Sequence, residues 1–208
     1  MANALKITEI LLNNNPEPKI ELNFSTPLEL LIATILSAQC TDKRVNTVTE
    51  SLFKKYRSAD DYANTEPAVL EEEIRSTGFY KNKARSIINC CKSLVVNFSG
   101  NVPSTIDELT SLDGVGRKTA NVVLGGAFGK QVIAVDTHVL RLSNRLGLVN
   151  SKKPDTVERE LMKQAPHDKW SQFNIALIIH GRQVCKAGKP LCPDCSLQNE
   201  CEWPEKVF

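Results

Sequence analysis

The sequence lacks several features that would assign it to a broad class of protein. It has no apolar run that could span a bilayer, since the longest candidate, Leu30 to Ala38, has the length of a core helix. It has no secretory hydrophobic segment near residue 1. Its net charge is only +2, so any surface for a nucleic acid must come from local clustering of its 26 Lys and Arg residues. We therefore expect a cytoplasmic protein without a membrane segment.

Signals for β-structure, internal repeats and low-complexity segments are also missing. Val132 to Val135 is a short apolar run that could be extended, but it stands alone. Helical periodicity dominates instead. Thr26-Pro27-Leu28-Glu29 has the form of a capping box that opens an apolar helix through Leu36. One buried helix face is indicated by apolar residues at three- and four-residue steps, namely Ala84, Ile87, Ile88, Cys91, Leu94, Val95 and Phe98. We expect an all-α fold.

Disulfides are not expected, because cytosolic thiols stay reduced. Three of the seven cysteines, Cys40, Cys90 and Cys91, lie in apolar-periodic segments and are interpreted as packing residues. The other four have the spacing C-x6-C-x2-C-x5-C, and they are Cys185, Cys192, Cys195 and Cys201. Structural zinc usually uses two C-x2-C pairs, and only one is present here. The spacing favours a [4Fe–4S] cluster, while zinc and four unmetallated thiols stay open as alternatives.

The segment around these cysteines is expected to be a small loop-rich unit, because Pro190, Pro193 and Pro204 disfavour a continuous helix. Lys186 and Lys189 fall in its six-residue gap. A loop tied by a metal centre would hold their charges rigidly for phosphate contacts. The alternative is that both lysines are simply solvated.

Gly114-Val115-Gly116 joins two short predicted helices, the first ending near Leu112 and the second running from Lys118 to Phe128. Glycines let the backbone approach another molecule closely, and the N-terminus of the second helix offers free N–H groups to an anion such as a DNA phosphate. Arg117 adds a positive charge. A lone G-x-G is usually just a turn, but between two helices it is more specific.

Lys118 is the strongest candidate for chemistry. A cation in the first turn opposes the helix dipole, so a purely solvated lysine there is slightly unfavourable. The same field favours the free amine, which can form a Schiff base with C1′ of a deoxyribose. Asp136 is placed to cap the next helix, and it could also stabilise a cationic sugar or help deprotonate the amine. His138, as a lone histidine, is interpreted as structural rather than catalytic.

These segments together resemble the endonuclease III family of DNA base-excision repair enzymes, within the helix–hairpin–helix glycosylases. The resemblance extends over nearly the whole chain. It is carried by the cysteine loop and by four motifs, which are Leu36-Ser37-Ala38-Gln39-Cys40-Thr41-Asp42, Gly114-Val115-Gly116-Arg117-Lys118-Thr119-Ala120-Asn121-Val122-Val123, Val135-Asp136-Thr137-His138 and His180-Gly181-Arg182. It implies a [4Fe–4S] cluster on the four cysteines.

The resemblance also implies a two-domain all-α fold with a DNA cleft between the domains. One domain would be a six-helix bundle at residues 20–130, with the helix–hairpin–helix at about 104–128. The other would join residues 1–19 to 131–208 and carry the iron–sulfur loop at 185–201. By the same resemblance the protein would be a monomer that associates with the nucleoid through DNA.

The implied activity is that of a bifunctional DNA N-glycosylase and abasic-site lyase. The hairpin, comprising Gly114, Val115, Gly116, Arg117 and Thr119, would grip duplex DNA while an oxidised pyrimidine is flipped out. Lys118 would attack C1′ with help from Asp136, and β-elimination would then cut 3′ of the abasic site. Duplex DNA containing oxidised pyrimidines or abasic sites is the expected partner.

Gln39 matches the residue that fills the gap left by the flipped base. Phe79 falls where relatives often place an aliphatic wedge, and an aromatic side chain could also separate a base step. The alternative for Phe79 is a core aromatic. Asp113 departs from the proline that is common in this hairpin, and a carboxylate beside a phosphate grip would weaken binding somewhat.

The sequence leaves two alternatives open. An adenine-removing monofunctional glycosylase of the same superfamily would generally lack a lysine at position 118 and would carry an extra C-terminal domain, for which the sequence leaves no room after Cys201. A non-catalytic iron–sulfur DNA-binding protein would need the hairpin and the cluster, but not Lys118 and Asp136 together.

Overall fold

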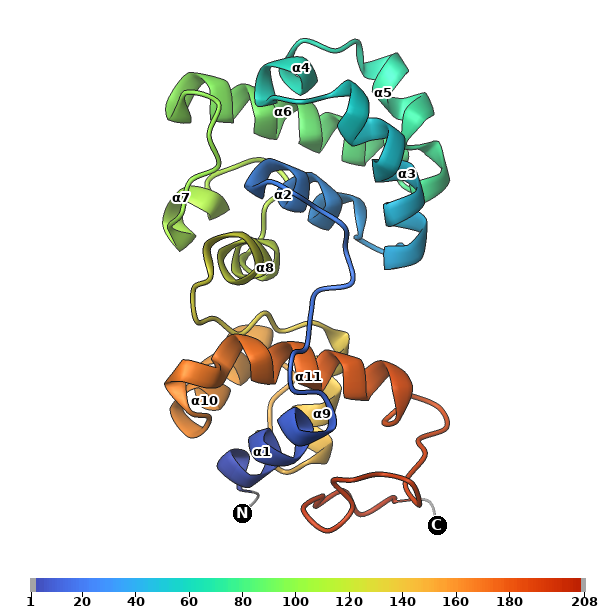
Figure 1. The fold of residues 1–208 in the computed structure, drawn as a ribbon, viewed down its shortest axis with the longest axis vertical. Coiled ribbons are helices and arrows are strands. Elements are labelled where there is room, and N and C mark those ends of the chain that lie inside the picture. Colours follow the sequence, from blue (N-terminus) through green and yellow to red (C-terminus); the bar gives the residue numbers. More distant parts are fainter. Residues whose placement is uncertain (1–2, 207–208) are drawn as a thin grey trace. The chain divides into compact units, whose positions relative to one another are not determined.

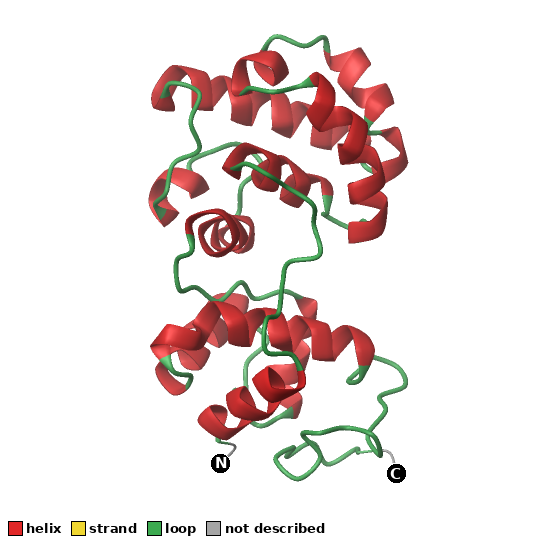
Figure 2. Ribbon diagram, in the orientation of Figure 1, coloured by secondary structure: helices red, strands yellow, loops and turns green. Residues whose placement is uncertain are grey.

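The computed structural model describes residues 3–206, and every regular element in that range is a helix (Figures 1 and 2). The expectation of an all-α fold is confirmed, and Val132 to Val135 is irregular rather than extended in a sheet. None of the helices described is long and apolar enough to cross a membrane. Residues 1–2 and 207–208, at the two ends of the expected discontinuous domain, lie outside the described residues.

The chain divides into two compact units. Unit 1 comprises Met1–Lys19 and Lys130–Phe208, and unit 2 comprises Ile20–Gly129. Unit 1 therefore joins the beginning of the chain to its C-terminal part, whereas unit 2 is continuous in sequence.

Unit 2 is built around α2. Its elements are α2 (Pro27–Leu36), α3 (Asp42–Lys55), α4 (Ala59–Ala63), α5 (Pro67–Glu73), the 3-10 turn η1 (Arg75–Thr77), α6 (Tyr80–Phe98), α7 (Ile106–Thr110) and α8 (Arg117–Phe128). Helix α2 packs against α3, α6 and α8, while α6 is covered by α4 and α5 and α7 packs on α8. Every residue from Leu30 to Leu36 is buried, as expected for a helix that is surrounded by others.

The start of α2 follows from local sequence. The Thr26 side chain accepts a hydrogen bond from the Glu29 amide, and Pro27 occupies the first helical position, so the predicted N-terminus is confirmed. The Glu29 carboxylate accepts a bond from the Ser25 amide at 2.6 Å, which closes the entry to the helix. These contacts fix the register of α2 and hence the position of its C-terminal end at Leu36.

Helix α6 buries the face that its apolar spacing predicted, including Ala84, Ile87 and Leu94. Cys90 and Cys91 are fully buried there, and burial raises the pKa of the Cys90 thiol to about 12. Cys40 differs from the expectation that it packs in a helix. It is only half-buried, in the turn between α2 and α3.

Unit 1 has its own core. Its elements are α1 (Ala4–Asn14), α9 (Thr137–Arg145), α10 (Pro154–Gln164), the 3-10 turn η2 (His167–Lys169) and α11 (Trp170–Gln183). Helices α1 and α9 each pack against both α10 and α11. The core includes Ile7, Val139, Phe173 and Leu177, together with Leu197 from the C-terminal loop. The loop is therefore anchored by an apolar side chain.

Two polar contacts also bind the C-terminal loop to α1. The Lys6 ammonium lies 2.5 Å from the Glu200 carboxylate, and the Asn14 amide donates to the Ser196 hydroxyl at 2.7 Å. Residues close to the start of the chain thus stabilise the segment that contains the four clustered cysteines.

Candidate functional site

The hairpin between α7 and α8 is built on a glycine that no other residue could replace without strain. Gly114 has φ +74°, in the left-handed region. A Cβ at this position would lie 2.7 Å from the Ser86 Cβ of α6, which is closer than two carbon atoms can approach. Val115 is buried, and its amide donates to the Leu112 carbonyl at 3.2 Å. The hairpin is therefore packed firmly against α6.

Gly116 has a different role, because its φ of −85° is open to any residue and a Cβ there would meet nothing within 4 Å. It is the N-cap of α8 and makes no side-chain capping bond. The first-turn amides of α8 are therefore not capped by their own N-cap side chain, and space lies over Gly116. Arg117 and Lys118 are exposed and Thr119 is half-buried in the same turn. This geometry suits a phosphate.

Asp113 is held by a neighbour on α6. Its Oδ2 accepts a hydrogen bond from the Asn89 Nδ2 at 2.9 Å. The carboxylate that departs from the common proline thus attaches the hairpin to α6, in addition to carrying a negative charge. Earlier in the chain, Thr105 is the N-cap of α7. Its side chain accepts a hydrogen bond from the Glu108 amide, and the Glu108 carboxylate accepts one from the Thr105 hydroxyl.

Gln39 and Phe79 share an unusual backbone conformation. Their φ angles are +53° and +49°, and with Ser99 they are the non-glycine residues of positive φ in the described range. Left-handed backbone at such residues costs about 1–3 kcal/mol and is concentrated at functional sites. Gln39 is exposed and Phe79 is 62% exposed, so Phe79 is not a core aromatic.

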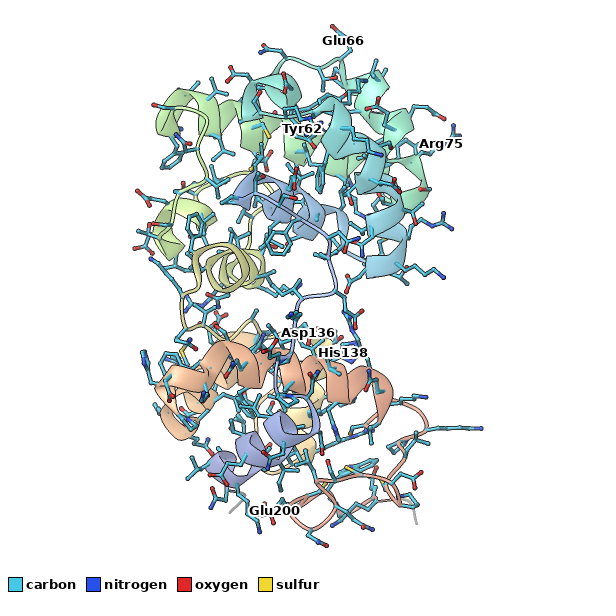
Figure 3. All side chains as sticks on the ribbon, viewed as in Figure 1. Tyr62, Glu66, Arg75, Asp136, His138 and Glu200 are labelled. Atoms are coloured by element: carbon cyan, nitrogen blue, oxygen red, sulfur yellow. The ribbon has the colours of Figure 1, made fainter. Side chains whose placement is uncertain are left out.

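Asp136 caps α9, as its position predicted. Its Oδ1 accepts hydrogen bonds from the amides of His138 and Val139, both at 2.8 Å, and the side chain is half-buried (Figure 3). The His138 Nδ1 lies 3.2 Å from the Arg141 Nη2 on the same helix. Asp136 belongs to unit 1 and Lys118 belongs to unit 2.

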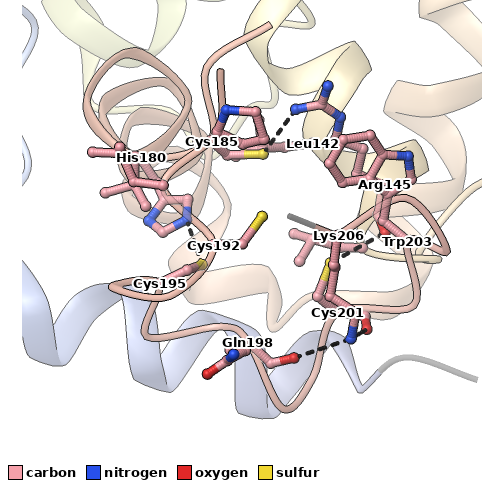
Figure 4. Close-up of a pocket in the computed structure, with 14 residues that line it drawn as sticks. Leu142, Arg145, His180, Cys185, Cys192, Cys195, Gln198, Cys201, Trp203 and Lys206 are labelled. Carbon is pink, nitrogen blue, oxygen red and sulfur yellow. Dashed lines mark hydrogen bonds between the residues drawn. The ribbon is translucent and has the colours of Figure 1, made fainter. Parts of the chain in front are cut away.

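The four clustered cysteines line one pocket of unit 1. Their sulfurs face a common space that is also bordered by Leu142 and Trp203 (Figure 4). Cys192 is buried, the other three are half-buried, and burial raises the pKa of Cys195. Within residues 3–206, no group of three or more His, Cys, Asp or Glu side chains is arranged to hold a single metal ion.

Two arginines of α9 hold this loop, and sequence reasoning did not identify them. The Arg145 guanidinium donates to the Cys185 sulfur at 3.3 Å and to the Lys186 and Ala187 carbonyls at 2.9 and 3.0 Å. It also lies over the Trp203 ring, 3.8 Å from its centroid. Arg141 donates to the Cys185 carbonyl at 2.9 Å. Their four-residue spacing on one helix was the available signal.

Lys186 and Lys189 are exposed on this loop. The backbone that carries Lys186 is held by Arg145, whose guanidinium donates to the Lys186 carbonyl at 2.9 Å. The Cys195 sulfur lies 3.4 Å from the His180 Nε2 of α11, which connects the loop to a second helix.

Comparison with known proteins adds to this geometry. Residues 32–167 match the family model described as HhH-GPD superfamily base excision DNA repair protein. The chain is 50% identical to an endonuclease III of Synechocystis, over 95% of this chain and 91% of that protein. It is 44% identical to an endonuclease III of Escherichia coli K12, over 99% and 98%.

Solved structures give the same result. A structure described as a trapped endonuclease III–DNA covalent intermediate, an estranged-adenine complex, superimposes with a TM-score of 0.91 and 47% sequence identity. That match covers 95% of this chain and 93% of the other.

Proposed function

This chain belongs to the endonuclease III family, within the HhH-GPD superfamily of base excision DNA repair proteins, and from that membership we propose that it is bifunctional. The family makes it a DNA glycosylase of base excision repair that binds DNA. The finer proposal is that it removes oxidised pyrimidines from duplex DNA and then cleaves the strand as an abasic-site lyase.

The observation that carries the proposal is the position of Lys118. It is exposed in the first turn of α8, two residues after Gly116, the N-cap of that helix. A phosphate bound at the N-terminus of this helix would bring the sugar backbone of DNA close to the Lys118 amine. A lysine amine is a sufficient nucleophile for a Schiff base once it is deprotonated. A relative that was trapped in a covalent intermediate with DNA supports a covalent step.

The proposed chemistry has two steps. In the first, the Lys118 nitrogen forms a bond to C1′ while the C1′–base bond breaks, and the base leaves with that electron pair and takes up a proton. Ring opening gives an iminium ion between Lys118 and C1′. In the second step, loss of a proton from C2′ expels the 3′ phosphate, which breaks the C3′–O bond. Hydrolysis then frees the lysine.

Asp136 is proposed to assist the first step. A carboxylate can stabilise positive charge that develops on the sugar and can accept the proton that the attacking ammonium must lose. Its Oδ1 already caps α9, so the side chain is held in one orientation before substrate arrives. Capping and catalysis are compatible roles for one carboxylate.

We propose that Cys185, Cys192, Cys195 and Cys201 bind a [4Fe–4S] cluster. The donor set fits, because four thiolates are the usual ligands of a cubane and all four sulfurs line one pocket. Structural zinc usually uses two C-x2-C pairs, and only Cys192 and Cys195 form such a pair here, so the spacing favours the larger centre over zinc. The cluster would brace the loop that carries Lys186 and Lys189.

We further propose that unit 2 is the bundle domain with the hairpin, and unit 1 the cluster domain, of the two-domain architecture. Within unit 2, Gln39 and Phe79 would enter the duplex where the damaged nucleotide has left it. Their exposure and left-handed backbone support this role.

Borohydride trapping tests the function directly. Wild-type protein and Lys118→Ala would be incubated with a duplex containing thymine glycol, reduced with borohydride, and examined for a covalent protein–DNA band. A band with wild type alone supports the Schiff base, the lysine and the substrate class together. Base release without a band would indicate a monofunctional glycosylase, and a parallel duplex with an adenine mismatch tests the adenine-removing alternative. DNA binding without release or a band would indicate the non-catalytic alternative.

A further inference from the structure

Lys83 is a buried cation that joins two separate turns of unit 2. Its side chain lies on the first turn of α6, and the residue is 5% exposed. The ammonium donates one hydrogen bond to the Leu36 carbonyl and another to the Thr77 carbonyl, both at 2.8 Å. Leu36 is 47 residues away in sequence, so the first bond connects α6 to the end of α2.

Each of these carbonyls belongs to the last residue of a helix, and a non-glycine residue with positive φ follows within three positions. Leu36 is the last residue of α2, and Gln39 follows three residues later with φ +53°. Thr77 is the last residue of η1, and Phe79 follows two residues later with φ +49°. Carbonyls at the C-terminal end of a helix lack an intrahelical partner, and a cation is favourable beside them. The Lys83 ammonium thus donates a hydrogen bond to one carbonyl at each of the two helix ends.

Local hydrogen bonds shape each turn separately. In the first turn, the Cys40 amide donates to the Ser37 carbonyl at 3.1 Å. In the second turn, the Gly78 amide donates to the Arg75 carbonyl at 3.3 Å. Such bonds determine how each turn folds, whereas the Lys83 ammonium links one turn to the other. Hydrogen bonds from a cation are stronger and shorter than those between neutral groups, so the link is stiff.

We propose that Lys83 is a positioning residue that fixes the spacing between the two insertion residues, Gln39 and Phe79. The inference rests on the proposed function, in which both side chains enter the duplex. Two side chains that must fill one gap in a base stack need a defined separation, because a displacement of about 1 Å can lower a rate by about 10²-fold. A buried ammonium between their two turns provides that constraint without touching DNA.

Burial lowers the pKa of Lys83 from its usual value, and the nearby Cys40 acts in the opposite direction. Burying the Lys83 ammonium therefore costs free energy, because the cation loses its contact with water. An apolar side chain would fill the same space without that cost, but it would leave two buried carbonyls without a donor. An apolar side chain at position 83 would therefore lose the two hydrogen bonds that connect α6 to Leu36 and Thr77.

The test compares Lys83→Met with Lys81→Met. Lys81 is an exposed lysine two residues earlier on α6, so its variant removes the same charge without breaking the link. The substrate is a duplex with thymine glycol opposite 2-aminopurine, whose fluorescence reports the unstacking of the opposite base. We expect Lys83→Met to slow both the fluorescence change and base release by about 10- to 100-fold, and Lys81→Met to stay within about threefold of wild type.

A single-stranded oligonucleotide with an abasic site separates positioning from general damage to the fold. It has no opposite strand, so insertion is not needed, and borohydride trapping on it reports the Lys118 chemistry alone. Lys83→Met should trap this substrate at the wild-type rate. An equal loss on the single strand and on the duplex would overturn the inference.

A double-mutant cycle tests whether Lys83 acts through Gln39 and Phe79. In a Gln39→Ala, Phe79→Ala background, adding Lys83→Met should cause no further loss, because the residues it positions are gone. Additive losses would overturn the inference. If Lys83→Met does not fold, Lys83→Gln, which removes the charge and shortens the side chain by one bond, takes its place in the same cycle and the same two outcomes apply. If Gln39→Ala, Phe79→Ala itself matches wild type, the insertion role in the proposed function is wrong, and the Lys83 inference falls with it.

Discussion

Asn89 donates a hydrogen bond to Asp113 at 2.9 Å, and through it α6 holds the hairpin. Ser86 lies three residues earlier on α6 and contacts Gly114, and Lys83 lies three residues before that. Residues spaced by three and four share one face of a helix. One side of α6 therefore supports the hairpin and the turns before Gln39 and Phe79, so the proposed DNA-contacting parts of unit 2 share one rigid element.

The Asp113 carboxylate gives a prediction about affinity. Asp113→Asn keeps an oxygen that can accept from Asn89 but removes a negative charge next to the proposed phosphate site. We expect DNA binding to tighten by about threefold at low salt, with the gain fading as salt rises. Fluorescence anisotropy with a labelled abasic-analogue duplex measures it. Asn89→Ala is the matched control, since it breaks the bond without changing the charge, and it should weaken binding. Weaker binding by Asp113→Asn would show that the charge is not unfavourable.

The two hairpin glycines should respond differently to alanine. Gly114→Ala forces a Cβ against Ser86 and requires a left-handed alanine, so we expect a loss of about 1–3 kcal/mol in unfolding free energy. The methyl group added by Gly116→Ala would have no neighbouring atom within 4 Å, so this variant should unfold at nearly the wild-type temperature. It should nevertheless bind DNA more weakly, because the methyl group covers the α8 amides. Thermal denaturation and binding, measured on both variants, check the contrast. Equal effects on stability would contradict it.

The observed capping role of Asp136 can be separated from its proposed catalytic role. Asparagine is as good an N-cap as aspartate, so Asp136→Asn should keep α9 and the melting temperature. It lacks the carboxylate, so base release should fall on the order of 10²- to 10³-fold. Asp136→Ala should in addition lose about 1 kcal/mol of stability. Single-turnover base release and calorimetry provide the data. Full activity in Asp136→Asn would leave capping as the only role of this residue.

Loss of one proposed cluster ligand should affect the C-terminal loop and DNA binding together. Cys195→Ser is expected to lower the bound iron and the visible absorption, to expose the 184–206 segment to proteolysis, and to weaken DNA binding. Cys40→Ser is the control for the iron content, because Cys40 is half-buried, lies in unit 2 and does not line the pocket. It should keep its iron. Normal DNA binding by an iron-free Cys195→Ser protein would show that the cluster is dispensable for recognition.

Local sequence predicted those features that depend on residues close together in the chain. The Thr26 cap, the Asp136 cap and the left-handed stop at Gly129 all depend on residues up to five apart, so spacing alone reveals them. The buried face of α6 followed from its period in the same way. The candidate residues Lys118 and Gln39 came from motifs, and their roles stay predictions.

The sequence by itself determined the all-α class, the caps at Thr26 and Asp136 and the family, because these depend on short-range patterns and on motifs that keep their spacing. Only the tertiary structure decided which distant residues meet. The bonds from Lys83 to Leu36, from Asn89 to Asp113 and from Arg145 to Cys185 span 47, 24 and 40 residues. Such pairs form where packing brings distant segments of the chain together, and no local sequence pattern specifies which partner lies nearby.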